Sequence, residues 1–189
     1  MQVILASKSP RRQEILKDIF PSFDILPQNV DEDVDEKDPK KMVMLLAEKK
    51  LNNLDQKYKD ALIISADTIV WLNGKVYGKP HTIENAIKTL EALSGTTHYV
   101  YTGVCIAYKG KRDIFYDEAR IIFRDLNRDE IVKYVNEKKP LDKAGAYGIQ
   151  DGDMVKEYIG SYANIMGFPI EKVKEELIKL GAIQWETFN

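Results

Sequence analysis

Apolar residues along the chain follow two patterns, short strand-like runs and helix-like spacings, and the two alternate. The strongest strand signal is ALIISADTIV, residues 61–70, which is rich in branched residues. Further strands are predicted at residues 1–6, 23–26, 99–108, 114–123 and 155–159, and helices at residues 10–20, 39–54, 83–93, 128–135 and 169–180. This alternation predicts an α/β fold built on a mixed sheet.

Local signals mark where several of these elements begin or turn. Two predicted helices start with a capping side chain followed by proline, whose missing N–H costs nothing at the first helical position. A third starts with a capping box, and an Asn-Gly pair predicts a hairpin turn. These signals lie at Ser9-Pro10, Asp38-Pro39, Asn127 with Glu130, and Asn73-Gly74.

The step from the first strand to the first helix concentrates cationic side chains. Residues 5–16, LASKSPRRQEIL, place Lys8, Arg11 and Arg12 around a helix start. The helix dipole repels cations there unless an anion is present, and the free backbone N–H groups also attract one. Phosphate is the expected anion, because arginine forks match its oxygens. The alternative is an ordinary helix start whose arginines lie on a solvated surface.

Carboxylates occur in two contrasting settings. Six of them lie between Asp31 and Asp38, a density typical of a solvated loop, although it could also supply one or two ligands to a hard cation. Asp67, in contrast, interrupts the apolar run of residues 61–70. Burying an unpaired carboxylate is expensive, so Asp67 is expected to meet a cation, a metal or a hydrogen-bond network.

Two lysines are candidate partners for an anion. Lys50 lies four residues after Leu46 on the apolar face of its predicted helix, so its ammonium either reaches out to solvent or points at a buried anion. Lys79 follows the Asn73-Gly74 turn, which is expected to return it near the strand that carries Asp67. The alternative for Lys79 is a surface lysine in a turn.

Length and composition favour one globular domain over residues 1–189. The 189 residues, 44% hydrophobic and 31% charged, suffice for one sizeable core. A net charge of −2 provides no global basic field, so neither nucleic acid nor a membrane is an expected partner. The single cysteine, Cys105, lies in an apolar run and is expected to be a buried, inert thiol, and a cytoplasmic location is expected.

Residues 141–150, LDKAGAYGIQ, contain too many small residues to pack well as a strand. Backbone that approaches a ligand is the expected reason for its Gly and Ala residues. Neither GxxxxGK[ST] nor GxGxxG after a strand occurs, which argues against P-loop and dinucleotide-binding enzymes. The candidate cations come from separate elements instead, and this arrangement suits a polyphosphate held along its length.

Five segments together resemble a known family. They are LASKSPRRQEIL, SADTIV, YGKP, LDKAGAYGIQ and GSYANIMGFPI, in this order and at these separations. They are similar to the motifs of the Maf family of nucleoside triphosphate pyrophosphatases, and the resemblance covers nearly the whole chain. It implies a three-layer α/β fold on a long twisted mixed sheet, shared with inosine triphosphatases, and a possible homodimer.

The resemblance also implies a reaction and a site. The reaction is hydrolysis of a nucleoside triphosphate to the monophosphate and pyrophosphate with a divalent cation, Mg²⁺ or Mn²⁺. Phosphate contacts are expected from Ser7, Arg11, Arg12, Lys50 and Lys79. Glu32 and Asp67 are expected to hold the cation, with Asp67 also activating the attacking water, although Asp31 and Asp33 compete with Glu32 for this role. The combination of Arg12, Thr68 and Gln150 resembles the branch that acts on dTTP and UTP.

Two alternatives remain open. One is a nucleotide-binding regulator of septum formation and cell division, which keeps a basic pocket without turnover. Asp67 argues against it, since a binding module gains nothing from an acid that repels the triphosphate. The other is a house-cleaning pyrophosphatase for modified nucleotides, which differs only in its choice of base.

Overall fold

The structure, a computed structural model, describes residues 1–52 and 54–184. Asn53, inside the second predicted helix, and residues 185–189 of the predicted single domain lie outside the described residues. The strands are β1 (Val3–Leu5), β2 (Asp24–Ile25), β3 (Leu62–Leu72), β4 (Lys75–Tyr77), β5 (Thr97–Tyr108), β6 (Lys111–Phe123) and β7 (Val155–Ile159). The α-helices are α1 (Pro10–Leu16), α2 (Pro39–Leu51), α3 (Leu54–Lys57), α4 (Ile83–Leu93), α5 (Arg128–Lys138), α6 (Tyr162–Ile165) and α7 (Ile170–Lys179), and two 3₁₀ turns are η1 (Ala144–Ala146) and η2 (Ile149–Asp151).

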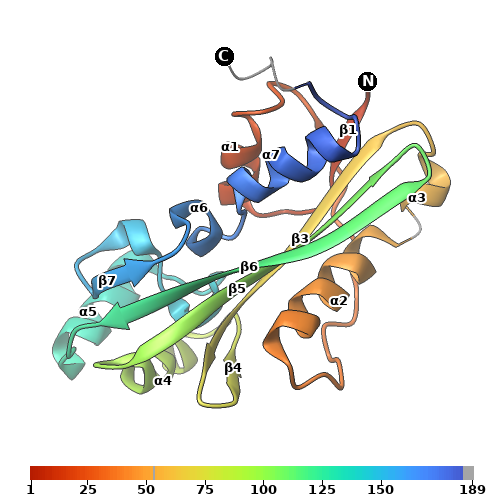
Figure 1. Ribbon diagram of the computed structural model, residues 1–189. Coiled ribbons are helices and arrows are strands. Elements are labelled where there is room, and N and C mark those ends of the chain that lie inside the picture. Colours follow the sequence, from red (N-terminus) through yellow and green to blue (C-terminus); the bar gives the residue numbers. More distant parts are fainter. Residues whose placement is uncertain (53, 185–189) are drawn as a thin grey trace. The chain divides into compact units, whose positions relative to one another are not determined.

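The strands of the described residues form one mixed sheet of seven strands (Figure 1). Its order is β2-β1-β3-β5-β6-β7, and β4 pairs with β3 off this path. β1 is parallel to both β2 and β3, whereas β4 is antiparallel to β3 and β7 is antiparallel to β6. The predicted mixed sheet is therefore confirmed.

The chain divides into two compact units, each described by itself below. Unit 1 contains Met1–Asp67, Thr102–Asp117 and the segment from Tyr162 onward, and unit 2 contains Thr68–Tyr101 and Glu118–Ser161. The long strands β3, β5 and β6 contribute residues to both.

Unit 1 has three layers, helices on each face of its part of the sheet. Alternation along β1 turns Val3 and Leu5 to one face and Ile4 and Ala6 to the other. The first face packs on α1 and α7 through a core that contains Leu16, Phe168, Val173 and Leu177. The second face packs on α2 and α3 through Ala47, Leu51 and Leu54. This confirms the three-layer α/β arrangement within unit 1.

The first helix is shorter than predicted. It begins as expected, with the Ser9 side chain capping and Pro10 at the first helical position, but it ends at Leu16 rather than at Phe20. The N–H groups of Asp18 and Ile19 bond to carbonyls three residues back, which tightens the chain into a turn. Ile19 and Phe20 nevertheless stay buried in the core. The apolar spacing therefore indicated their burial correctly, although the helix ends before them.

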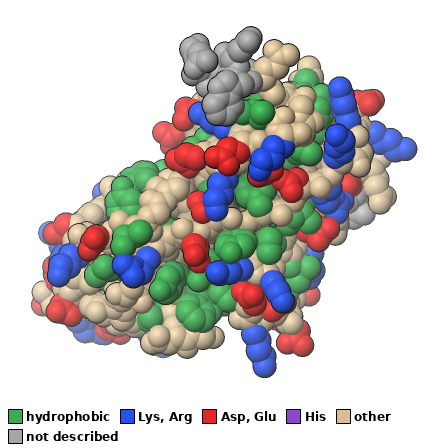
Figure 2. Space-filling model, viewed as in Figure 1, with side chains coloured by type: hydrophobic (Ala, Val, Ile, Leu, Met, Phe, Trp, Pro, Cys, Tyr) green, Lys and Arg blue, Asp and Glu red, His purple; other side chains and the backbone are tan. Residues whose placement is uncertain are grey.

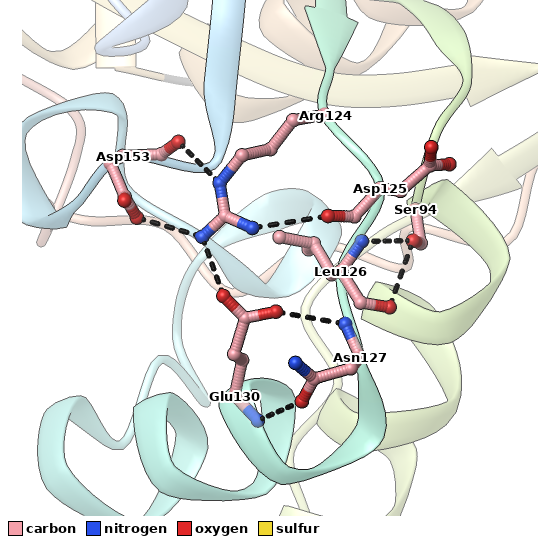
Figure 3. A network of polar contacts seen from close by, with 7 residues as sticks. All are labelled: Ser94, Arg124, Asp125, Leu126, Asn127, Glu130 and Asp153. Carbon is pink, nitrogen blue, oxygen red and sulfur yellow. Dashed lines mark hydrogen bonds and ion pairs between the residues drawn. The ribbon is translucent and has the colours of Figure 1, made fainter.

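The helix starts of unit 2 agree with the capping signals. In α5 the Asn127 side chain accepts from the Glu130 N–H at 2.9 Å, and the Glu130 carboxylate accepts from the Asn127 N–H at 2.9 Å. Arg124 donates to the same Glu130 carboxylate at 2.8 Å and to Asp153 at 2.9 Å (Figure 3). The Arg124 guanidinium thus links the capping box of α5 to Asp153, which lies shortly before β7.

One apolar residue of α4 lies outside the core. The Ile83 side chain is 39% exposed, whereas Ala86, Leu90 and Leu93 are buried. Ile83 is the first residue of the helix, and the buried face begins only with the next turn. Thr82 caps this helix, because its hydroxyl accepts from the Asn85 N–H at 3.1 Å.

Gly145 of the 141–150 loop packs closely against its neighbours inside unit 2. Gly145 has a φ of +71°, and a Cβ on it would lie 2.6 Å from Cγ2 of Val70 on β3. The Gly145 N–H donates to the Gly78 carbonyl at 3.2 Å. Close approach to β3 therefore requires this glycine, and the expected approach of the loop backbone to a ligand stays a prediction.

Two further expectations concern burial and surface. Cys105 is buried, as predicted, and burial raises the pKa of its thiol to about 12, so the thiol stays protonated.

On the face drawn in Figure 2, basic and acidic side chains are intermingled over the surface. Among the described residues, no helix combines the length and the apolar composition needed to cross a bilayer.

Candidate active site

Lys50, Asp67 and Glu32 form an ionic cluster in unit 1. The Lys50 ammonium donates to Oδ1 of Asp67 and lies 2.8 Å from Oε1 of Glu32. The Lys50 and Asp67 side chains are only 13% and 10% exposed, whereas that of Glu32 is 57% exposed. The sequence left open whether Lys50 points to solvent or to a buried anion, and its contact is with the buried anion.

Secondary structure explains why Lys50 and Asp67 meet. Asp67 lies on β3 within the apolar run, so the strand carries it into the buried part of the unit. Lys50 is in the last turn of α2, where the helix dipole favours a cation, and Leu46 and Leu51 anchor the helix in the core. The carboxylate of Asp67 therefore has the cationic partner that its burial requires.

The structure separates Glu32 from its acidic neighbours. The Asp31 carboxylate accepts from the backbone N–H of Asp33 at 2.9 Å, which turns it toward its own loop. Lys49 donates to the Asp31 carbonyl at 3.4 Å and so ties this loop to α2. Glu32 is the residue of the three that is ion-paired with Lys50. Glu32 and Asp67 thus contact the same ammonium, and their role in holding a cation stays a prediction.

Arg12 lies against the same cluster. Its guanidinium donates to the Ala66 carbonyl at 2.9 Å, to the Gly167 carbonyl at 2.8 Å and to the Ser7 hydroxyl at 3.2 Å. Burial lowers the pKa of Arg12, and the negative charges of Asp67 and Glu32 oppose this shift. The guanidinium remains charged, since its ordinary pKa is far above neutral. The charge is therefore held rigidly next to Asp67.

The other cations of the first helix are placed differently. Arg11 donates from Nε to the Met166 carbonyl at 3.4 Å, whereas Lys8 is exposed. Ser7 is buried and its hydroxyl also accepts from the Ser9 N–H at 3.2 Å. Of the expected cationic cluster, Arg11 and Arg12 are thus both fastened to the 166–167 turn.

Sequence reasoning missed the carbonyl groups that orient these arginines. They belong to Ala66, Met166 and Gly167, which lie far from the arginines in sequence. A backbone carbonyl has no residue-type signature. The only signal was indirect, because both segments, SADTIV and GSYANIMGFPI, stood out as motifs.

Three predicted residues belong to unit 2. Thr68 is partly buried on β3, Lys79 is exposed after β4, and Gln150 is exposed in η2. The Asn73-Gly74 turn that precedes Lys79 is confirmed, with φ values of +50° and +81° and Leu72 paired with Lys75. The participation of these three residues in a site with the unit 1 cluster stays a prediction.

The donor set of unit 1 fits a divalent cation. The described residues contain no group of three or more His, Cys, Asp or Glu side chains arranged to hold a metal. Mg²⁺, however, is commonly held by one or two carboxylates together with substrate phosphates and water. Asp67 and Glu32 are two such carboxylates, and the Lys50 ammonium between them shows that they jointly accommodate positive charge.

The chain is similar to known proteins over nearly its whole length. The dTTP/UTP pyrophosphatase of Thermosipho africanus is 42% identical over 185 residues, which cover 97% of this chain and 95% of the relative. Those of Thermococcus kodakarensis and Clostridium botulinum are 41% and 43% identical, covering 92% and 94% of this chain and 95% and 98% of the relatives.

The fold is also found in a solved structure, that of the Staphylococcus aureus Ham1 protein. The TM-score is 0.57 at 16% sequence identity, and the match covers 95% of this chain and all of the other. This likeness confirms the predicted fold class. Residues 2–180 match the family described as Maf-like protein, and the chain belongs to this Maf family.

Proposed function

We propose that this protein is a nucleoside triphosphate pyrophosphatase that acts on dTTP and UTP. The observation that carries the proposal is the buried Asp67, flanked by the fixed charges of Lys50 and Arg12 and by Glu32. Relatives that share about two fifths of the sequence over nearly the full chain are named dTTP/UTP pyrophosphatase, which supports the same substrates here.

The phosphate contacts follow from the cations. Arg11, Arg12 and Lys50 supply positive charge in unit 1, Ser7 supplies a hydroxyl, and Lys79 adds a cation from unit 2. A triphosphate carries several negative charges, and arginine forks match its oxygens. Because Arg12 is held by two backbone carbonyls, its charge needs little reorganisation when substrate arrives.

The chemical step follows from Asp67. Its carboxylate accepts a proton from water, the water oxygen bonds to the α-phosphorus, and the bond from this phosphorus to the bridging oxygen breaks. Pyrophosphate leaves with the electron pair of that bond, and the cationic side chains stabilise the charge as it develops. Glu32 and Asp67 would hold Mg²⁺ or Mn²⁺, which supplies further stabilisation of the phosphate charge.

Base selection is assigned to Gln150 with Thr68 and Arg12. A primary amide has one acceptor and two donors, and uracil and thymine present an N3–H donor beside a carbonyl acceptor. Cytosine presents an acceptor beside an amino donor, so the same amide would have to flip. This difference favours UTP and dTTP over CTP.

The test is a panel of nucleoside triphosphates with Mg²⁺, scored separately for pyrophosphate and for orthophosphate without added pyrophosphatase. We expect pyrophosphate as the first product, turnover highest with UTP and dTTP, and loss of turnover when EDTA removes the cation. Release of orthophosphate alone would contradict attack at the α-phosphorus. Tight binding of the nucleotide without any turnover would favour a regulator, and preference for a modified nucleotide would favour the house-cleaning alternative.

A further inference from the structure

We infer that Tyr134 is a positioning residue for base selection, because its hydroxyl bonds to the Gly148 N–H before Gln150 and to the Asp151 carboxylate after it. This inference rests on the proposed function, in which Gln150 contacts the base. Tyr134 lies on α5, inside the helix that the sequence predicted at residues 128–135.

One hydroxyl joins the two residues that bracket Ile149 and Gln150. The Gly148 N–H donates to the Tyr134 hydroxyl at 3.1 Å, and this hydroxyl in turn donates to Oδ2 of Asp151 at 3.1 Å. The Asp151 N–H closes the turn by donating to the Gly148 carbonyl at 3.0 Å. Both ends of the short turn are therefore attached to α5 through a single atom.

A largely buried ion pair reinforces this attachment. Lys143 donates to the same Oδ2 of Asp151 at 2.6 Å, and the two side chains are 16% and 15% exposed. A Cβ on Gly148 would lie 2.6 Å from that oxygen and 2.9 Å from the Lys143 ammonium. The pair thus packs directly against the backbone of Gly148, where a Cβ would have to displace the carboxylate or the ammonium.

Gln150 itself has a different environment. It is exposed, and among the described residues its side-chain amide makes no hydrogen bond to the protein. Its backbone is fixed from both sides while its amide remains available to a ligand. Discrimination between uracil and cytosine requires that the amide keep one orientation, since the two bases differ by exchange of donor and acceptor. The anchored turn fixes the backbone position from which the amide reaches the base edge, and so limits the placements in which it could meet cytosine as well as uracil.

The test is Tyr134→Phe, which removes the hydroxyl and keeps the ring. We expect the ratio of kcat/KM for UTP to that for CTP to fall by about tenfold, since two hydrogen bonds at the turn are lost. Tyr58→Phe in unit 1 removes a tyrosine hydroxyl from a partly buried ring and serves as the matched control, with the ratio unchanged. Hydrogen exchange of residues 143–151 should be faster in Tyr134→Phe than in the control.

A second variant acts on the same bridge from the other side. Gly148→Ala adds a methyl group that displaces the Asp151 carboxylate, so it should lower the UTP to CTP ratio even if Tyr134→Phe fails to fold. In a Gln150→Ala background, Tyr134→Phe should produce no further fall in the ratio. That result separates positioning of Gln150 from a general loss of structure.

The outcomes separate this inference from the function on which it rests. A wild-type enzyme that hydrolyses UTP and CTP equally well overturns the proposed base selection. A wild-type preference that survives unchanged in both Tyr134→Phe and Gly148→Ala overturns the inference alone. An equal loss of kcat/KM for UTP and CTP also overturns it, because a merely structural role would lower both.

Discussion

The ammonium of Lys50, at the end of α2, donates a hydrogen bond to the carboxylate of Asp67 on β3, and both side chains are almost entirely buried. Each charge satisfies the other where water is scarce. In the proposed reaction, Asp67 is the base and Lys50 is a cation that binds substrate phosphate. The contact that stabilises the fold therefore involves the same two residues as the proposed chemistry.

Replacement of Asp67 by Asn should abolish most turnover while the fold is retained. The amide keeps the shape of the carboxylate but cannot accept a proton from water or hold a cation as an anion. We expect kcat to fall by about 10²-fold or more with UTP as substrate. Asp55→Asn, which neutralises one of the partners of Arg112 elsewhere in unit 1, is the matched control and should keep near-normal turnover. Wild-type turnover in a folded Asp67→Asn protein would remove Asp67 from the mechanism.

The Lys50–Asp67 pair should also be visible in stability. Lys50→Met leaves the Asp67 carboxylate buried without this cation, and loss of one partner of a buried pair typically lowers the free energy of unfolding by about 3–5 kcal/mol. Lys50→Met combined with Asp67→Asn should be more stable than Lys50→Met alone, because the uncompensated charge is gone. Urea denaturation of the four proteins measures this coupling. Simple additivity of the two substitutions would show that the side chains do not interact.

Gln150→Ala should flatten the base preference. The variant loses the amide that can bond to the N3–H and carbonyl of uracil, so kcat/KM for UTP and dTTP should fall toward the value for CTP. Recognition of this kind is worth several kcal/mol at most, and a fall of about 10–100-fold is expected. Gln13→Ala, which changes an amide on α1, should leave the preference intact. Selectivity that persists in Gln150→Ala would exclude this residue as the base contact.

Stability should depend on pH through His98. This side chain is fully buried in unit 2, with Nε2 2.9 Å from the Tyr147 hydroxyl, and burial lowers its pKa to about 4. The unfolded chain takes up a proton at His98 near pH 6.5, whereas the folded protein does so only near pH 4. Stability is therefore lost as the pH falls through this window, by up to about 3 kcal/mol.

Chemical denaturation between pH 7 and pH 4 tests this dependence. His98→Gln cannot titrate, so the free energy of unfolding should decline less steeply with falling pH than in the wild type. Exposed His81→Gln is the control and should keep the wild-type slope. Identical slopes in wild type and His98→Gln would mean that other groups govern the acid response.

Gly103→Ala should destabilise unit 1 for a purely steric reason. A Cβ at this position of β5 would overlap the Val43 carbonyl group of α2 and lie 2.6 Å from the Met44 nitrogen. The backbone of α2 cannot rotate aside as a side chain can. We therefore expect the free energy of unfolding to fall by about 1–3 kcal/mol. Gly78→Ala, which meets nothing within 4 Å, should change stability little. Equal stability of both variants would show that α2 shifts to accept the methyl group.

Much of the fold could be predicted from the sequence, because the signals that mark its helices, strands and turns are local. A capping side chain, a proline after it, an Asn-Gly pair and a run of branched residues each act within a few residues. The starts of α1, α2 and α5, the β3–β4 turn and the whole of β7 were accordingly correct. The choice of Asp67 as a special residue also followed from sequence alone, since a carboxylate in an apolar strand requires a partner.

Other features depended on tertiary contacts. The packing of α2 and of the 31–38 loop near β3 decided two open questions. Lys50 contacts a buried anion and not solvent, and Glu32 is the acid of the loop that lies beside it. The chain after α1 tightened into a turn, and the close approach of Val70 to Gly145 could not be seen in the sequence. The carbonyls that hold Arg12 and the tyrosine hydroxyl that brackets Gln150 have no local signature. Their partners lie 14 to 155 residues away in the chain, so only folding brings them together.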